Sequence, residues 1–379
     1  MIRVGIIGCG KMADQHALQI QRIPNAEIRA VCDSEPLMAR QLAERFHVAS
    51  AFTRPQDMLK AAALDVVHIT TPPPSHFSLG KACLEAGCNI YVEKPFTLNM
   101  SEAEELIRCA DQKGLKVTAG HNAQFTPVMM RMRELVNRGY LGGRPIHLES
   151  QYCYEFGDAG YAKSLLGDRG HWVRALPGSL LQNIISHGVS KIAEFLTGEH
   201  PTVMAQGFTS PFLESIGEPD IIDEVRVLIR DDATTAYFTF SSQIRPVPHQ
   251  FRIYGPRGSL IVDDDHQILI ELDNRAYKSY LRYFIPPFRF ARQYVGNFKT
   301  NFGKFLRKDF HLPNDAALKT LIESFYRSID GAAPLPLSYR EILLTTKIMD
   351  DIFTQINDQR TNAHPARDPN RFKMQCLRS

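Results

Sequence analysis

Val4-Gly5-Ile6-Ile7-Gly8-Cys9-Gly10-Lys11-Met12-Ala13 is an apolar strand that leads into a Gly-x-Gly-x-x-Ala turn. Gly8 permits a tight exit from the strand, Gly10 lets a phosphate approach the backbone, and Ala13 lets the next helix pack closely on the sheet. The first N–H groups of that helix are unpaired and favour an anion. The turn therefore predicts a seat for a dinucleotide pyrophosphate. The residues expected to contact the cofactor here are Gly8, Cys9, Gly10, Lys11 and Met12.

A second apolar strand supports this interpretation. The segment 26–32 ends at Asp33, twenty residues after Ala13. An acidic residue at this point of a doubly wound fold binds the ribose hydroxyls of the adenosine. A helix N-cap is the plain structural alternative, and Asp33 can serve in both roles. Because a carboxylate repels a 2′-phosphate, NAD is favoured over NADP.

Composition limits the class of protein. The 379 residues are 44% hydrophobic and 22% charged, which is typical of a globular chain large enough for two domains. The sequence has no apolar run long enough to span a membrane and begins directly with a strand, so we expect a cytoplasmic protein. Its seven cysteines include no Cys-x-x-Cys pair, so we expect reduced thiols and no metal site.

Hydrophobic periodicity divides the chain into an N-terminal Rossmann domain at 1–123 and a second domain at 124–356. The first alternates strands and amphipathic helices, which predicts a doubly wound parallel sheet with ligand at the carboxyl ends of its strands. Strands are predicted at 2–7, 27–32, 65–70, 88–92 and 115–119, and helices at 36–46, 75–86 and 101–113. The last of these helices is predicted to start with a capping box between Ser101 and Glu104.

The second domain is predicted to be α+β, with a large open antiparallel sheet and flanking helices. Strands are predicted near 144–154, 201–208, 222–230, 233–242, 249–254, 258–263 and 267–272, and helices near 127–138, 178–197, 315–329 and 338–356. We expect the polar tail 357–379 to be extended or poorly ordered.

Two strand ends in the first domain carry polar residues at the rim where a cofactor would lie. One strand runs into Thr71, Pro72 and His76, and the next runs into Glu93 and Lys94. We expect these residues to take part in cofactor binding. The structural alternatives are a surface Lys94 paired with Glu93, and a His76 that caps a helix.

Asn183 and His187 form a third candidate group. They are four residues apart, so one continuous helix would place them on the same face. Their neighbours are apolar, and a buried histidine that serves only packing is the alternative to a catalytic one.

The motifs of this sequence, taken in their order along the chain, resemble those of one family. They are the glycine turn, Asp33, the run from Thr71 to His76, Glu93-Lys94-Pro95, Gly120-His121-Asn122, the helix with His187 and Gly255-Pro256-Arg257-Gly258-Ser259-Leu260. It is the glucose-fructose oxidoreductase / inositol dehydrogenase / rhizopine catabolism (Gfo/Idh/MocA) family of oxidoreductases. The resemblance covers about residues 1–272 and resumes in the closing helices. It implies a nicotinamide cofactor, a sugar, nucleotide-sugar or inositol substrate, and homo-oligomers (dimers or tetramers) that form through the open sheet.

The resemblance also implies roles for individual residues. Asn122 would belong to the cofactor site. Lys94 would contact the reacting hydroxyl and the nicotinamide, and His187 would be the general acid/base. Many relatives have aspartate where this chain has Asn183, so proton transfer would fall on His187 alone, because an amide is not a base. The usual arginines after Asn122 are replaced by Ala123 and Gln124.

Three functions are compatible with these residues. The first is an NAD-dependent dehydrogenase that acts on a CH–OH group of a sugar or nucleotide sugar. The second is an epimerase or eliminase that retains and recycles its NAD. The third is a catalytically weak NAD-binding scaffold that docks through the segment 275–311.

That segment, the basic aromatic insertion 275–311, holds nine lysines and arginines against one acidic residue, and eleven of the 36 aromatic residues of the chain. An oligomer interface or lid is the favoured interpretation. A peripheral membrane contact is the second, because rings and cations suit a lipid headgroup region. We expect no nucleic-acid partner, since no nucleic-acid-binding fold accompanies the charge.

Overall fold

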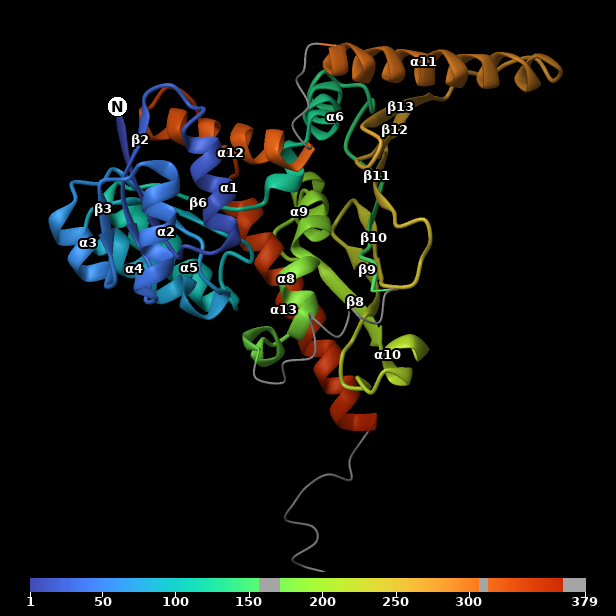
Figure 1. The fold of residues 1–379 in the computed structure, drawn as a ribbon. Helices are drawn as coiled ribbons and strands as arrows, with labels where there is room; N and C mark the ends of the chain where they lie inside the picture. The colour runs from blue at the N-terminus through green and yellow to red at the C-terminus, as the bar shows by residue number, and fades with distance from the viewer. Residues whose placement is uncertain (157–170, 307–312, 364–379) are drawn as a thin grey trace, which may run out of the picture.

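The computed structural model describes residues 1–156, 171–306 and 313–363, and contains two sheets with helices between and around them (Figure 1). The first sheet is entirely parallel, with strand order β3-β2-β1-β4-β5-β6. Its order reverses at β1, which is the switch point of a doubly wound fold. The predicted N-terminal fold class is therefore confirmed. The strands are β1 (Ile2–Ile7), β2 (Ala26–Cys32), β3 (Ser50–Phe52), β4 (Val66–Ile69), β5 (Asn89–Val92) and β6 (Val117–Ala119).

Five helices of the N-terminal part alternate with these strands, and their apolar sides build one core with the sheet. β4 is buried at every position, because helices cover both faces of a parallel sheet. The helices are α1 (Lys11–Ile20), α2 (Pro36–Phe46), α3 (Pro55–Ala61), α4 (His76–Glu85) and α5 (Met100–Lys113).

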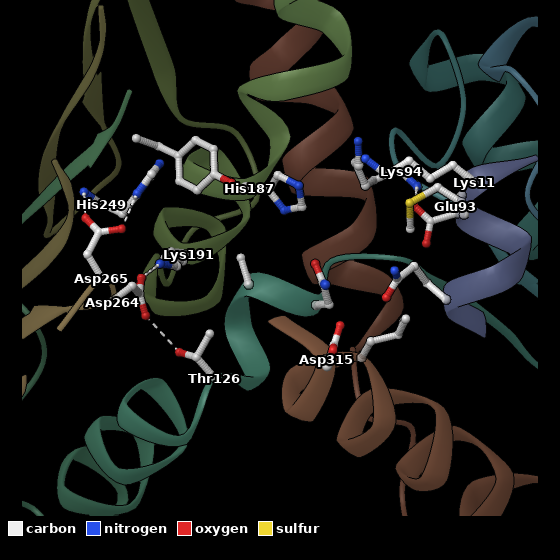
Figure 2. Close-up of a pocket in the computed structure, with 16 residues that line it drawn as sticks. Lys11, Glu93, Lys94, Thr126, His187, Lys191, His249, Asp264, Asp265 and Asp315 are labelled. Carbon is white, nitrogen blue, oxygen red and sulfur yellow. Dashed lines mark hydrogen bonds and ion pairs between the residues drawn. The ribbon is translucent and has the colours of Figure 1, made fainter. Parts of the chain in front are cut away.

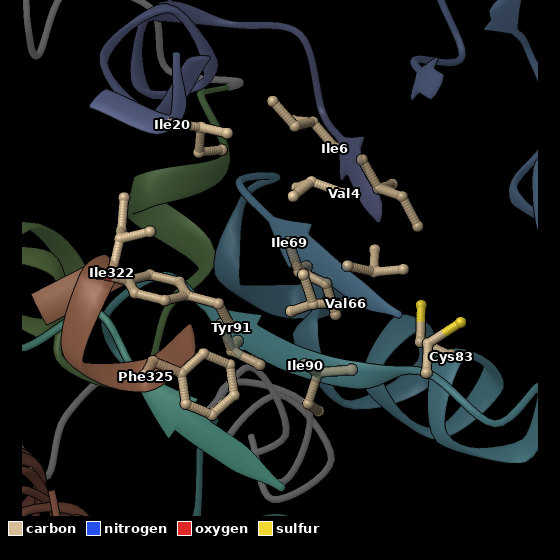
Figure 3. Packing of buried hydrophobic residues seen from close by; sticks show 14 of the residues in the cluster. Val4, Ile6, Ile20, Val66, Ile69, Cys83, Ile90, Tyr91, Ile322 and Phe325 are labelled. Carbon is tan, nitrogen blue, oxygen red and sulfur yellow. The ribbon is translucent and has the colours of Figure 1, made fainter. Parts of the chain in front are cut away.

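A late helix completes this core. α12 (Pro313–Ile329) lies against α1 and contributes Leu321, Ile322 and Phe325 to the cluster around β1, β4 and β5. Figure 3 shows Ile322 and Phe325 beside Tyr91 of β5. The N-terminal core therefore needs residues more than 300 positions along the chain.

The second sheet has the order β13-β12-β11-β7-β10-β9-β8. Its neighbouring strands are antiparallel except β7 and β10, which are parallel, so the sheet is mixed where the sequence predicted an antiparallel one. The reason is that β7 and β10 are separated by some eighty residues that include helices, which allows a crossover connection. The strands are β7 (His147–Tyr152), β8 (Thr202–Phe208), β9 (Glu224–Arg230), β10 (Thr235–Ser241), β11 (His249–Tyr254), β12 (Gly258–Asp263) and β13 (Ile268–Asp273).

The described helices cover one face of this sheet and leave the other open. α9 (Ser186–Phe195) packs on β7 and β10, and α13 (Tyr339–Ala363) packs on β8 and α9 (Figure 1). Burial alternates along β8 and β10, because successive side chains point to opposite faces. α13 also contacts α5, so it joins the two sheets.

The structure corrects several predicted helix boundaries. α5 is capped by Asn99, which accepts a hydrogen bond from the Glu102 N–H, and Ser101 lies inside the helix. α13 continues to Ala363, so residues 357–363 are helical; the rest of the tail lies outside the described residues. The short β3 was not predicted, since three residues carry no clear periodicity.

The predicted helix at 178–197 is two helices. α8 (Ser179–Ile184) ends at Ile184, and α9 begins at Ser186, with Ile185 between them. This break falls between Asn183 and His187, so they do not share the face of one regular helix.

The insertion 275–311 contains the short helix η4 (Leu281–Tyr283) and the long helix α11 (Ile285–Leu306). α11 lies along the edge strand β13 at one end of the molecule (Figure 1). Among the described residues, no helix has the length and apolarity to cross a membrane.

Candidate active site

A cavity of about 500 Å³ lies between the carboxyl edge of the first sheet and the helical side of the second. Figure 2 shows Lys11, Glu93 and Lys94 on one side of it, His187 in the middle, and Lys191, His249, Asp264 and Asp265 across from them. Elements from both parts of the chain thus face one space. This is where a doubly wound sheet binds ligands.

The glycine turn has the shape that the sequence predicts. Gly8 has a φ of +92°, and a Cβ there would lie 2.8 Å from the backbone nitrogen of Thr71. A Cβ at Gly10 would meet nothing within 4 Å, so a ligand can approach the backbone there. No side chain caps the N-terminus of α1, and Lys11 and Met12 line the cavity. These features fit a pyrophosphate on the N-terminus of α1.

Asp33 directly follows β2 and is hydrogen-bonded to the backbone of the glycine turn. Its Oδ2 accepts a hydrogen bond from the Cys9 N–H at 2.6 Å, and its Oδ1 accepts one from the Glu35 N–H at 2.9 Å. The second bond is an Asx turn that leads into α2. The N-cap of α2 is Glu35, so Asp33 is not the N-cap that the structural alternative predicts. It is half-exposed, and its carboxylate retains lone pairs for a ribose.

Lys94 points across the cavity toward α8. Its Nζ donates to the backbone oxygen of Asn183 at 2.9 Å and to the Asn183 Oδ1 at 3.1 Å. It is thus no surface lysine paired with Glu93. Burial lowers the pKa of the Lys94 ammonium, and the Glu93 carboxylate opposes this shift.

The break between α8 and α9 explains this contact. In a continuous helix the Asn183 carbonyl would accept from the N–H four residues later. Here the Gly188 and Val189 N–H groups both donate to Ile185, and the Asn183 carbonyl is available to Lys94. The helix break therefore brings Lys94 and Asn183 together.

His187 follows the break and lines the cavity. Its ring lies 5.2 Å from the ring of Tyr152, and its buried Nδ1 has no hydrogen-bond partner among the described residues. Burial, together with the nearby Lys94 cation, lowers the pKa of His187 well below its ordinary value. The imidazole is therefore neutral at neutral pH.

Other predicted residues take supporting places. Both ring nitrogens of the buried His76 lie 2.9 Å from carbonyl oxygens, those of Thr71 and Pro95. His76 thus ties the two strand ends together and does not line the cavity. Thr71 packs against Gly8, and Pro72 directly precedes the short helix η1 (Pro73–Ser75). Asn122 lines the cavity.

Glu93 belongs to a buried polar chain that sequence reasoning missed. Its Oε1 lies 2.9 Å from the His16 Nε2, the two Nδ1 atoms of His16 and His68 are 2.7 Å apart, and the His68 Nε2 lies 2.8 Å from the Tyr326 hydroxyl. Burial lowers the pKa of His68 and raises that of Tyr326, so both are neutral.

One set of tautomers satisfies this chain. Tyr326 donates to His68, His68 donates to His16, and His16 donates to the Glu93 carboxylate. Burial alone would raise the pKa of Glu93, but the bond from His16 and the nearby Lys94 lower it. The sequence offered no signal for this contact, because His16 lies on α1, His68 on β4 and Tyr326 on α12, and Glu93 follows β5.

A second missed group lines the far side of the cavity. Lys191 forms an ion pair with Asp264, and the Asp264 Oδ1 accepts from the Thr126 hydroxyl at 2.8 Å. The His249 Nδ1 lies 2.6 Å from the Asp265 Oδ1. Lys191 could have been found, since it lies one turn after His187 on α9. The run of three aspartates at 263–265 gave no such signal, because acidic residues between two predicted strands are typical of a turn.

The comparisons with known proteins agree with this geometry. Residues 2–121 match the model of an oxidoreductase family with the NAD-binding Rossmann fold. The D-glucoside 3-dehydrogenase of Escherichia coli K12 is 36% identical over 142 residues, which are 37% of this chain and 40% of that protein. The inositol 2-dehydrogenase of Rhizobium meliloti is 23% identical over 72% of this chain and 78% of its own length.

Solved structures show the same fold over nearly the whole chain. The WlbA dehydrogenase from Bordetella pertussis, solved with NADH and UDP-GlcNAcA, has a TM-score of 0.73 at 15% identity, covering 94% of this chain and 96% of that one. The UDP-N-acetylglucosamine 3-dehydrogenase GnnA from Acidithiobacillus ferrooxidans has a TM-score of 0.67 at 21% identity, covering 93% and 98%. Together with the glycine turn and Asp33, the match shows that residues 2–121 carry the NAD-binding Rossmann fold of the Gfo/Idh/MocA oxidoreductases.

Proposed function

We propose that this protein is an NAD-dependent dehydrogenase that oxidises a secondary hydroxyl of a sugar or nucleotide sugar. The observation that carries the proposal is that Lys94 and His187 line the same cavity as the N-terminus of α1. A cation and a neutral imidazole beside a dinucleotide seat are the groups that oxidation of an alcohol requires.

The turn between β1 and α1 would hold the pyrophosphate of NAD, with Gly8, Gly10, Lys11 and Met12 closest to it. Asp33 would accept hydrogen bonds from the adenosine ribose and repel the 2′-phosphate of NADP. We therefore propose NAD as the preferred cofactor.

The chemistry assigned to the chain is a proton transfer and the stabilisation of a charge. When bound, NAD supplies the acceptor for the hydride that leaves the carbinol carbon. His187 accepts the proton of the reacting hydroxyl, since its imidazole is neutral. Lys94 stabilises the negative charge that develops on the oxygen. Asn183 orients the Lys94 ammonium through its carbonyl and amide oxygens.

The far side of the cavity suits a substrate with several hydroxyls. Lys191, Asp264 and Thr126 offer donors and acceptors, and His249 with Asp265 offers more. Each sugar hydroxyl both donates and accepts, so such a wall can bind a ring at several points. The names of the relatives, a glucoside dehydrogenase and an inositol dehydrogenase, support this substrate class.

A screen for NADH formation tests the proposal. The intact protein is given NAD or NADP and a panel of nucleotide sugars, free sugars and inositols, and absorbance of the reduced cofactor is followed. We expect turnover with NAD on at least one member. His187→Ala and Lys94→Ala should each lower kcat/KM by about 100-fold or more.

Matched controls are the exposed residues His200 and Lys60, whose alanine variants should keep full activity. Cofactor binding, measured by fluorescence of added NADH, should persist in His187→Ala. Full activity in the Lys94/His187 double variant would place the active site elsewhere. Substrate conversion with NADH formed only on the enzyme would identify an epimerase or eliminase that recycles its cofactor. Cofactor binding without any conversion would favour a scaffold.

We also propose a homo-oligomer, a dimer or tetramer, formed through the open face of the second sheet. Met204, Leu228 and Tyr237 are register neighbours on β8, β9 and β10, and all three are exposed. A row of exposed apolar side chains across a sheet is typical of an interface.

A further inference from the structure

Helix α11 has the opposite distribution of polar and apolar side chains to an ordinary surface helix. A surface helix normally buries its apolar stripe and exposes its polar side. In α11 the amide side chains face the protein, and the aromatic side chains face away from it.

The inward side of α11 caps the edge strand β13. The Asn297 amide bonds both the N–H and the carbonyl of Leu269, at 3.2 and 2.9 Å. The Gln293 amide does the same for Glu271, at 2.7 and 2.9 Å. Asn301 donates to the His266 carbonyl at 3.0 Å. These side chains occupy backbone groups that an edge strand would otherwise offer to another strand. The orientation of α11 is therefore anchored by specific bonds.

The outward side carries an aromatic stripe. Phe288 lies nine residues before Asn297, which places the two on opposite sides of a helix with 100° per residue. The side chains of Phe288, Phe298 and Phe302 are 71%, 64% and 47% exposed. The rings of Phe298 and Phe302 stack at 5.7 Å, and those of Phe302 and Phe305 at 5.9 Å. The result is a continuous apolar ridge along the helix.

Cations border this ridge. Arg292 and Lys299 are both exposed. Arg292 lies four residues after Phe288, and Lys299 lies four residues after Val295, so both cations lie on one flank of the aromatic stripe. The helix contains no acidic residue. Among the described residues, Arg289 is the member of α11 that forms an ion pair, with Asp273 on the inward side. The outward charge is thus uncompensated and positive.

We propose that α11 docks flat on the surface of an anionic lipid bilayer, with its rings at headgroup depth and Arg292 and Lys299 on lipid phosphates. An interfacial helix combines a one-sided apolar face with basic residues beside it. α11 lies at one extremity of the molecule, where a flat surface can reach it without meeting other elements (Figure 1). It does not meet the requirements of a spanning helix.

Charge favours lipid over a second copy of the chain. Two α11 helices packed ridge to ridge would bring Arg292 and Lys299 of both copies together without an acidic residue from either helix. Like charges at such an interface repel. An anionic lipid surface removes this repulsion. The apolar ridge is buried equally well against lipid and against a second copy.

Co-sedimentation with vesicles tests the proposal on the intact chain. We expect the protein to bind vesicles of phosphatidylcholine with phosphatidylglycerol, and to bind pure phosphatidylcholine far more weakly. Phe298→Ser with Phe302→Ser should abolish detectable binding. Arg292→Gln with Lys299→Gln should lower the partition coefficient on the anionic vesicles about 30-fold, since each cation near such a surface contributes about a fivefold factor.

Matched controls carry the same changes at exposed positions elsewhere. Leu18→Ser with Leu37→Ser removes two exposed apolar side chains, and Lys60→Gln with Lys113→Gln removes two exposed cations. Both should bind vesicles like the unaltered protein. Circular dichroism should show unchanged unfolding temperatures for all variants, because none of these residues is buried.

Three results would overturn the proposal. The first is equal binding of the unaltered protein and the Phe298/Phe302 variant to anionic vesicles. The second is no vesicle binding together with a smaller oligomer for that variant in light scattering, which would make α11 an interface between copies. The third is binding to nucleic acid but not to vesicles.

Discussion

At the scale of single residues, the proposed active site depends on a lysine and a histidine whose pKa values are both lowered by burial. In the proposed reaction, His187 must be neutral to accept a proton, and Lys94 must be charged to stabilise an alkoxide. The pH dependence of activity therefore reports on both residues.

We expect kcat/KM for oxidation to be constant around neutral pH. It should fall at acid pH only as His187 is protonated, well below pH 6.5, the ordinary pKa of histidine. It should fall at alkaline pH as Lys94 loses its proton, at a pH below the ordinary 10.5. A pH–rate profile measures both limbs. An acid limb centred at or above pH 6.5 would contradict the assignment of His187.

The buried chain from Tyr326 to Glu93 gives a second prediction at this scale. Tyr326→Phe leaves the His68 Nε2 buried without a partner, so the free energy of unfolding should fall by about 1–2 kcal/mol. Activity should change little, because the bond from His16 to Glu93 remains. Urea unfolding and kcat/KM measure the two effects.

Tyr283→Phe removes an exposed hydroxyl and is the control, with an expected change below about 0.5 kcal/mol. His16→Phe removes the donor to Glu93 itself. We expect it to lower activity as well as stability, and a loss of stability alone would show that Glu93 does not need this bond.

At the scale of elements, the break between α8 and α9 decides the site. The apolar run around Asn183 predicts one helix, because local propensity and periodicity are continuous through it. The break allows Asn183 to present its carbonyl to Lys94 and lets α9 approach the second sheet. A Cβ at Gly188 would lie 2.4 Å from the ring of Phe238, so the close approach requires glycine.

The junction between α5 and α13 gives a prediction about stability. The Asp350 Oδ2 of α13 accepts a hydrogen bond from the Met100 N–H of α5 at 2.8 Å. Burial raises the pKa of Asp350 to about 6, from an ordinary 3.8. Because the folded-state value is higher, the stabilisation by this group is complete below pH 3.8 and is lost as the pH rises through about 6.

Asp350→Asn keeps an acceptor for Met100 and removes the titration. As the pH rises from acid to neutral, the free energy of unfolding of this variant should increase by about 1 kcal/mol relative to that of the unaltered protein. This value allows for the partial exposure of Asp350. Urea unfolding at the two pH values measures it. Asp111→Asn, at an exposed position of α5, controls for the lost negative charge. A gain of equal size in both variants would assign the effect to net charge.

At the scale of the whole molecule, the described residues leave two apolar surfaces exposed, which are the sheet face with Leu228 and the ridge of α11. We expect the sheet face to carry self-association. Leu228→Lys should reduce the oligomer to monomers at micromolar concentration, because a cation would be buried at the interface without a partner. Light scattering measures the mass. Leu37→Lys, at an exposed site on α2, is the control and should leave the oligomer intact.

The whole molecule also decides how the N-terminal part is built. We propose the division 1–123 and 124–356, with α12 crossing from the second part to complete the first core. The strand–helix alternation predicts the parallel sheet, since that pattern is local. It does not predict which late helix covers the sheet, because the apolar face of an amphipathic helix does not specify the surface against which it packs.

The sequence by itself determined the glycine turn, the place of Asp33, the alternation of the first sheet and the identity of Lys94 and His187 as candidates. Each of these depends on residue type and short spacing. The tertiary structure alone decided that Lys94 reaches Asn183, that His16, His68 and Tyr326 support Glu93, and that the aromatic side of α11 faces outward. Such contacts join residues that are far apart in the chain, and short-range periodicity carries no information about which of them meet.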